Sequence, residues 1–84
     1  MSAKKVYVVS GAEYFTDSEE LFQDNVRVFT SREMAIEDIA ARVLSDLAVY
    51  ANDGAVEIEC EEFERCVEWN HGRAGWNIDA IDIE

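Results

Sequence analysis

The chain has 84 residues, of which 49% are apolar, and its 19 acidic and 7 basic residues give a formal net charge of −12. This apolar fraction excludes a disordered segment, and the length allows one small domain, which we expect to span residues 1–84. The negative charge excludes nucleic acid and anionic membranes as direct partners, because both would be repelled. It favours a basic partner, although many cytosolic proteins are acidic without any such role.

The two cysteines and the first fifteen residues indicate the cellular compartment that we expect for this protein. Cys60 and Cys66 do not make a disulfide framework, and MSAKKVYVVSGAEYF has an apolar run too short for a signal peptide. No stretch approaches the ~20 apolar residues that span a bilayer. We therefore expect a reduced, cytoplasmic protein.

The first elements in chain order are two predicted strands. KKVYVVS, residues 4–10, is apolar on both faces and is expected to be a central strand. Residues 11–25 carry five acids and no base and are expected to form a long loop. VRVFT, residues 26–30, is the second strand, with Val26 and Val28 on one face.

A long helix follows. Thr30 and Glu33 match a capping box that begins it, and residues 52–54, Asn-Asp-Gly, end it. The opposite face carries Met34, Ala41 and Ala48, which are either small surface residues or a shallow docking face for a second copy or another partner. The apolar stripe expected against the sheet consists of Ile36, Ile39, Ala40, Val43, Leu47, Tyr50 and Ala51.

The remaining residues predict two further strands and a short helix. AVEIEC, residues 55–60, alternates as a half-buried strand does, whereas the spacing in residues 61–69 favours a short helix. Residues 70–75 are expected to form a loop, and residues 76–84 a last strand with a bulge near Ala80. The predicted fold is α+β in the order β-β-α-β-α-β. A three- or four-stranded, mainly antiparallel sheet carries the long helix on one face.

Metal binding and catalysis find little support. Cys60, Cys66 and His71 give three soft ligands without the close cysteine pair of structural zinc sites. A nucleophilic Cys66 would need His71 as its base and an oxyanion site. No glycine-rich phosphate loop or G-x-S-x-G motif occurs. We expect no catalytic residue, metal or cofactor, with an enzyme using Cys66 and His71 as an alternative.

The acids predict a partner surface. Residues 53–84 hold ten acids and two arginines. Carboxylates on one face of a strand recur every ~6.6 Å, a scale comparable to the phosphate spacing of DNA. Trp69 and Trp76 either add anchoring contacts beside them or close the core. The first predicted patch comprises Glu57, Glu59, Glu61, Glu62, Glu64 and Glu68, and the second comprises Asp17, Glu19, Glu20 and Asp24.

In size, charge and layout the chain resembles small acidic proteins of phages and mobile elements that block host defence, the anti-CRISPR and anti-restriction inhibitors of the DNA-mimic type. The stretch VRVFTSREMAIEDIA, a strand leading into a capped helix, also resembles a pattern in small phage α+β proteins. The resemblance implies a non-enzymatic inhibitor in the host cytoplasm that blocks the nucleic-acid-binding site of a CRISPR effector. The alternative is a cytosolic homodimeric interaction or regulatory module that docks through the outer helix face.

Overall fold

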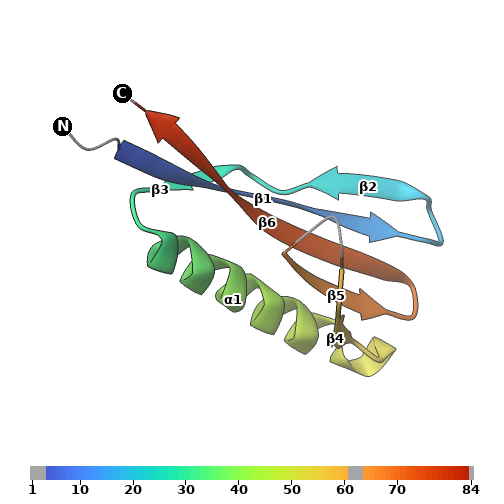
Figure 1. Cartoon of the computed structure of the whole chain (residues 1–84). Coiled ribbons are helices and arrows are strands. Elements are labelled where there is room, and N and C mark those ends of the chain that lie inside the picture. The colour runs from blue at the N-terminus through green and yellow to red at the C-terminus, as the bar shows by residue number, and fades with distance from the viewer. Residues whose placement is uncertain (1–3, 61–63, 84) are drawn as a thin grey trace.

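The computed structural model describes residues 4–60 and 64–83, which form a six-stranded sheet with one long helix across one of its faces (Figure 1). The other face carries no second layer in this part of the chain (Figure 1). The elements are β1 (Lys4–Phe15), β2 (Glu20–Gln23), β3 (Arg27–Phe29), α1 (Arg32–Val49), the 3₁₀ turn η1 (Ala51–Asp53), β4 (Val56–Ile58), β5 (Arg65–Trp69) and β6 (Gly72–Ile83).

The two longest strands form the spine of the sheet. β1 and β6 pair antiparallel over their whole length, from Lys4 opposite Ile83 to Phe15 opposite Gly72. β2 and β3 pair with successive parts of the other edge of β1, while β5 pairs with β6 and β4 with β5, all antiparallel. The spine projects past the start of α1 as a twisted ribbon, so the two ends of the chain lie side by side (Figure 1).

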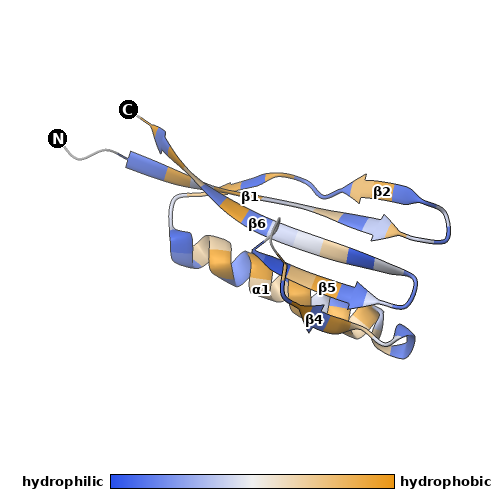
Figure 2. Ribbon diagram, turned by 45° about the vertical axis from the view of Figure 1, so that its right-hand side comes forward, coloured by the Kyte–Doolittle hydropathy of each residue, from blue (hydrophilic) through white to orange (hydrophobic). Residues whose placement is uncertain are grey.

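The hydrophobic core lies between α1 and the sheet. Val9 of β1, Val67 of β5, and Ile39 and Val43 of α1 are almost completely buried. Each such side chain contributes about 1.5–3 kcal/mol to folding. Hydrophobic stretches of α1 lie beside those of β5 (Figure 2). This burial on one face fixes the helix side of the sheet.

Both tryptophans belong to this core. Trp69 and Trp76 are 4% and 3% exposed, and the ring of Tyr50 stacks on Trp69 with ring centroids 3.8 Å apart. Trp76 lies opposite Gly11, where an added Cβ would stand 2.1 Å from Cδ1 of the indole. Glycine at position 11 therefore makes room for the ring. The two tryptophans close the core and do not add anchoring contacts to an outer surface.

The predicted α+β class is confirmed, with a long helix on one face of a mainly antiparallel sheet. The strand count was wrong because residues 11–25 form a hairpin of β1 and β2 in place of a loop. The predicted short helix over residues 61–69 was also wrong, since Arg65–Trp69 is strand β5. Its side chains Cys66 and Val67 are both buried, one on each face of the sheet, which produced a helix-like spacing.

Smaller corrections concern the ends of elements. The helix cap is Ser31, whose hydroxyl accepts a hydrogen bond from the Met34 amide at 3.5 Å, in place of Thr30. Ala35 lies against the sheet, which leaves Ile36 43% exposed. No bulge occurs near Ala80, because the pairing of β6 with β1 is continuous. The predicted loop over residues 70–75 is a two-residue turn followed by the start of β6.

Candidate functional site

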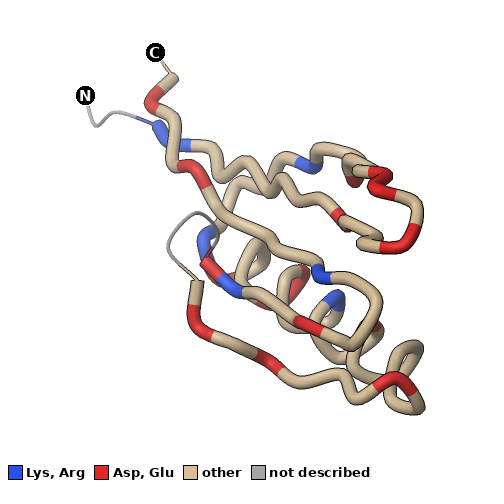
Figure 3. The backbone as a smooth tube through the Cα atoms, turned by 90° about the vertical axis from the view of Figure 1, so that its right-hand side faces the viewer, with Lys and Arg blue, Asp and Glu red and all other residues tan. Residues whose placement is uncertain are grey.

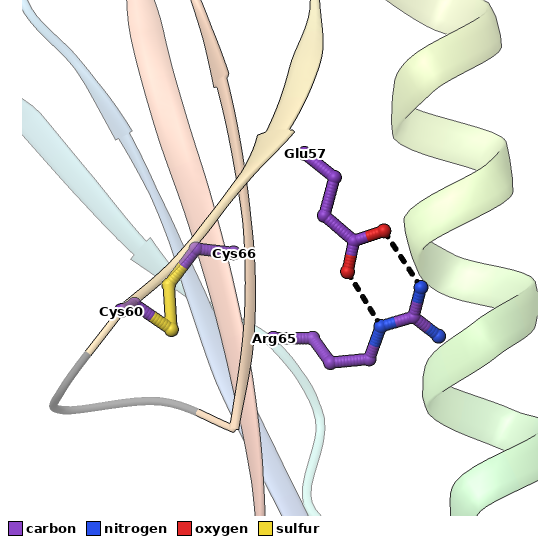
Figure 4. Close-up of a disulfide and its surroundings, with 4 residues drawn as sticks. All are labelled: Glu57, Cys60, Arg65 and Cys66. Carbon is purple, nitrogen blue, oxygen red and sulfur yellow. Dashed lines mark hydrogen bonds and ion pairs between the residues drawn. A yellow bond between two sulfur atoms is a disulfide. The ribbon is translucent and has the colours of Figure 1, made fainter.

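The first acidic patch does not form the predicted row. β4 ends at Ile58, so Glu57 is its only glutamate, and Glu59 lies beyond the strand. Glu57 is in register with Val67 and therefore lies on the helix side of the sheet. Its two carboxylate oxygens accept hydrogen bonds from Nε and Nη2 of Arg65, both at 2.7 Å (Figure 4). These bonds hold the pKa of the Glu57 carboxyl below its ordinary value.

The other members of this patch are dispersed. Glu64 forms an ion pair with Arg32 at 3.4 Å, and Glu68 of β5 lies opposite Arg73 of β6. An arginine therefore lies beside each of Glu57, Glu64 and Glu68. Glu59 is exposed and forms no ion pair within the described residues. Glu61 and Glu62 lie outside the described residues.

Three members of the second patch lie together in the hairpin between β1 and β2, where the acidic residues cluster at one end of the molecule (Figure 3). Asp17, Glu19 and Glu20 are all exposed. Glu19 has a φ of 55°, a left-handed conformation that few residues other than glycine adopt without strain. The hairpin therefore holds a glutamate at a position where glycine would be easier to accommodate.

Asp24 lies away from the tip of this hairpin, residues 17–20, and belongs to an ion-pair network. Arg27 bonds Asp38 at 2.9 Å and Asp24 at 3.3 Å, and Arg42 contacts the same two carboxylates. All four side chains are half-buried. The network ties the segment after β2 to the flank of α1, so the charge of Asp24 is balanced within the fold.

An acid that the sequence pattern did not reveal lies next to this network. Asp46 is on the sheet side of α1, and its Oδ2 is buried without a hydrogen-bond partner in the described structure. Burial, followed by the nearby charges of Glu13 and Asp24, raises the pKa of Asp46 to about 6. The Tyr50 hydroxyl donates to Glu13 at 3.1 Å, and burial and Glu13 raise its pKa to about 12. The one sequence signal for this site is that Asp46 is a charged residue next to the apolar stripe of the helix.

His71 is part of a structural clasp at one end of the sheet. Its Nδ1 lies 2.7 and 2.8 Å from the two carboxylate oxygens of Asp53, and its backbone amide donates to the same carboxylate. The Thr16 amide donates to the His71 carbonyl oxygen at 2.9 Å. The hydrogen bond to Asp53 is the main reason that the pKa of His71 is raised. These contacts join two hairpin turns to η1.

The expected free thiols are instead a disulfide between Cys60 and Cys66 (Figure 4). The bridge lies on the side of the sheet away from α1, opposite the Glu57–Arg65 pair (Figure 4). A sulfur in this bond is no thiolate nucleophile, and His71 is engaged with Asp53. This pairing removes the expectation of reduced cysteines and the support for an enzyme that uses Cys66 and His71.

The same side of the sheet carries a groove of about 1130 Å³. Its floor follows a row in register across the strands, from Gln23 of β2 to Ala12, Gly75, Cys66 and finally Ile58 of β4. The residues at the centre of the row are alanine and glycine, and those at its ends are larger, so the surface is hollowed along the middle strands. The lining also includes Leu21, Val26, Tyr14, Arg73, Glu59 and Cys60.

The groove face is unusually apolar for the outer side of a sheet. Leu21, Val26 and Val28 are 61%, 63% and 60% exposed. Val56, Ile81 and Ile83 of the same face are also exposed. An antiparallel sheet that meets water on one side normally presents polar residues there. This face therefore has the composition of a surface that another element covers.

Within the described residues, no group of three or more histidine, cysteine or acidic side chains could hold a metal ion. No helix in the same ranges is long and apolar enough to cross a membrane. Comparison with protein families, with curated proteins and with solved structures found no match. The geometry above is therefore the basis for a proposal about function.

Proposed function

We propose that this chain is a non-enzymatic inhibitor that binds a basic, nucleic-acid-handling protein and occupies its nucleic-acid-binding surface. A CRISPR effector is the target class that we put forward, with the host cytoplasm as the place of action. The partner would be drawn in by negative charge, as a nucleic acid is. The chain itself would bind no nucleic acid or membrane.

The observation that carries the proposal is the unequal pairing of charges. Five of the seven bases are engaged in ion pairs, which leaves Lys4 and Arg73 without one in the described part of the chain. Seven exposed carboxylates have no ion pair there. They are Glu19, Glu20, Glu33, Glu37, Glu59, Glu68 and Asp79. These exposed carboxylates are thus available to steer association with a cation-rich partner.

The hairpin tip is the part of this charge that we assign to the contact. Glu19 and Glu20 are exposed and project from the end of the sheet, whereas Glu57 and Asp24 are already engaged with arginines. Glu59 stands on the far wall of the groove from the hairpin. The revised contact surface therefore keeps Glu59 and, from the second predicted patch, Asp17, Glu19 and Glu20, and it gives less weight to Glu57 and Asp24.

The test is inhibition of DNA binding by purified CRISPR effector complexes of the main types, followed by the anisotropy of labelled target DNA. The chain should lower DNA binding by at least one of them, and less so as salt is raised. The double variant Glu19→Lys/Glu20→Lys should weaken inhibition at least about tenfold. No inhibition with any effector would contradict the proposal.

A matched control uses the outer side of α1. Glu33→Lys/Glu37→Lys changes the net charge by the same amount at two other exposed glutamates. This variant should keep inhibition within about threefold of the unmodified chain, since screening limits the reach of exposed charges to roughly 8 Å at physiological salt. Equal loss in both variants would mean that only net charge matters and would contradict the hairpin assignment.

A second candidate function is a homodimeric interaction or regulatory module that docks through the outer face of α1. The observation that favours it is the exposure of Met34, Leu44 and Val49 on that helix, at 51%, 67% and 66%. The candidate predicts a dimer that persists at high salt and that Ala41→Glu separates. Light scattering of the unmodified chain and of the Ala41→Glu variant measures the oligomeric state. An unmodified chain that is monomeric at all salt concentrations would contradict this candidate.

A further inference from the structure

The face of the sheet opposite α1 combines a hollow with exposed apolar walls. Along β1 the residues of this face include Ser10, Ala12 and Tyr14, and β6 contributes Gly75 beside Ala12. Small side chains at the centre leave the depth that a partner side chain can fill. The hollow lies over the same central strands that support α1 on the other face.

The two walls of the groove come from opposite edges of the sheet. Leu21 and Val26 stand on the side of β2, and Ile58 stands on the side of β4. The disulfide of Cys60 with Cys66 completes the second wall and ties the segment after β4 to β5. The groove thus has a floor and two sides that belong to the folded sheet itself.

The charges around the groove indicate which kind of partner can bind there. Arg73 at one end is opposite Glu68, and Asp24 is balanced by Arg27 and Arg42, so these charges offset one another. Glu59 on one wall has no ion pair in the described ranges, whereas Glu20 is in register with Phe15 and lies on the helix side of β2. A second copy of this chain would bring another −12 to the same place. Like charge therefore disfavours self-association through this face.

We infer that the groove binds an amphipathic helix of the partner protein, with its apolar face on Ala12 and Gly75 and with lysine or arginine beside Glu59. A helix suits this face because α1 already covers the other face of the same strands in that way. The inference rests on the proposed function for the basic character of the partner and adds the form of the segment and the surface that receives it.

The test uses three synthetic peptides of about 18 residues, roughly five helical turns. The first is built from leucine and lysine with all leucines on one helical face, and the second has the same composition in scrambled order. The third replaces each lysine of the first with glutamate. Affinity is measured by anisotropy of labelled peptide, and the bound surface by amide chemical shifts of the isotope-labelled chain.

The amphipathic basic peptide should bind at least about tenfold more tightly than the scrambled one. Its largest shifts should fall at Ala12, Gln23 and Gly75, and the acidic peptide should not bind. Ala12→Trp, which fills the hollow, should weaken binding about tenfold or more, whereas Ala41→Trp on the outer helix face should leave it unchanged. Leu21→Ser, at an exposed position, should weaken binding without affecting the fold.

Other results would overturn the inference in distinguishable ways. Equal binding of the amphipathic and scrambled basic peptides, with shifts confined to the acidic hairpin, would remove the groove but leave a charge-driven partner. Shifts on the outer face of α1 would assign docking to that helix instead. Dimerisation of the free chain that Ala12→Trp abolishes would make a second copy the occupant. Absence of binding by every basic peptide would contradict the groove alone, because inhibition of DNA binding by the effectors tests the proposed function separately.

Discussion

Arg65 holds both carboxylate oxygens of Glu57 at 2.7 Å, on the helix side of the sheet. The two residues are diagonal neighbours on one face of β4 and β5, so their charges cancel over the distance at which a partner would sense them. An acid that looks free in the sequence is therefore engaged in the fold. This pair separates carboxylates that support the sheet from those available to a partner.

The pair gives the first prediction. Replacing both members, Glu57→Gln with Arg65→Gln, leaves the net charge unchanged and should keep affinity for the partner within about twofold. The exposed pair should contribute only ~0.2–1 kcal/mol to the free energy of unfolding. Effector inhibition and urea denaturation measure the two quantities. A large loss of inhibition would place Glu57 or Arg65 in the contact.

The second prediction concerns the strained position in the hairpin. Glu19→Gly should raise the free energy of unfolding by up to about 1 kcal/mol, because glycine adopts a φ of 55° without the Cβ clash. The same change should weaken inhibition, since it removes an exposed carboxylate of the proposed contact. The control is Glu37→Gln, which removes one exposed carboxylate without placing a destabilising glycine in α1. Unchanged inhibition by the Glu19→Gly variant would contradict the assignment of the hairpin.

The third prediction follows from the buried carboxyl of Asp46. Its pKa is about 6 in the fold against an ordinary value of 3.8, so the folded state binds the proton more tightly between these pH values. Stability should therefore fall as pH rises through this window. Asp46→Asn should be more stable than the unmodified chain at pH 8, by on the order of 1 kcal/mol after allowance for solvent. The advantage should vanish near pH 4.

Thermal denaturation of both proteins across this pH range measures the effect. The raised pKa of His71 makes a contribution of the same sign, since its protonated form is favoured by Asp53 in the folded state. The difference between variant and unmodified chain cancels that contribution. A difference that stays constant from pH 4 to pH 8 would show that Asp46 does not titrate there.

The fourth prediction concerns the disulfide. Cys60 and Cys66 are six positions apart, and closing so short a loop stabilises a fold by about 2 kcal/mol. Cys60→Ser/Cys66→Ser should lower the free energy of unfolding by that amount and keep the fold, because the core lies on the other face. The unmodified chain in excess reductant should match the variant. Equal stability of oxidised and reduced chains would contradict this.

The helix was predictable from sequence because its signals are local. A capping serine or threonine and an apolar period of 3.6 lie within residues 30–49. The predicted end at Asn52-Asp53-Gly54 was late, because α1 ends at Val49 and these residues belong to the 3₁₀ turn η1 and its cap. Even so, the pattern favoured Ile36 over Ala35 for the buried side, because hydropathy ranks isoleucine higher. Contact with the sheet, rather than side-chain size, set the rotation of α1.

The missed strands have a different cause. The turn at residues 16–19, Thr-Asp-Ser-Glu, has no glycine or proline to mark it, and β1 is apolar on both faces. In β6 the apolar residues Ile78 and Ile81 fall on opposite faces, which suggested a bulge. Alternation fails as a signal because the outer face of this sheet is itself apolar.

The groove could not be predicted, since it depends on register between distant residues. Ala12 and Gly75 are neighbours only because β1 and β6 pair along their whole length. The disulfide depends likewise on β4 pairing with β5, which brings the segment after Ile58 back beside Cys66. The excess of acidic residues could be read from the sequence. Which carboxylates remain without an ion pair depends on the fold.

The most direct test of the central claim is the apparent Kd of a CRISPR effector for its target DNA at increasing concentrations of this chain. Occupation of the nucleic-acid-binding surface predicts that the apparent Kd rises in proportion to the concentration of the chain, without reaching a ceiling, and that the effect weakens as salt is raised. An apparent Kd that does not change with any effector, or that levels off while DNA remains bound, would contradict the account.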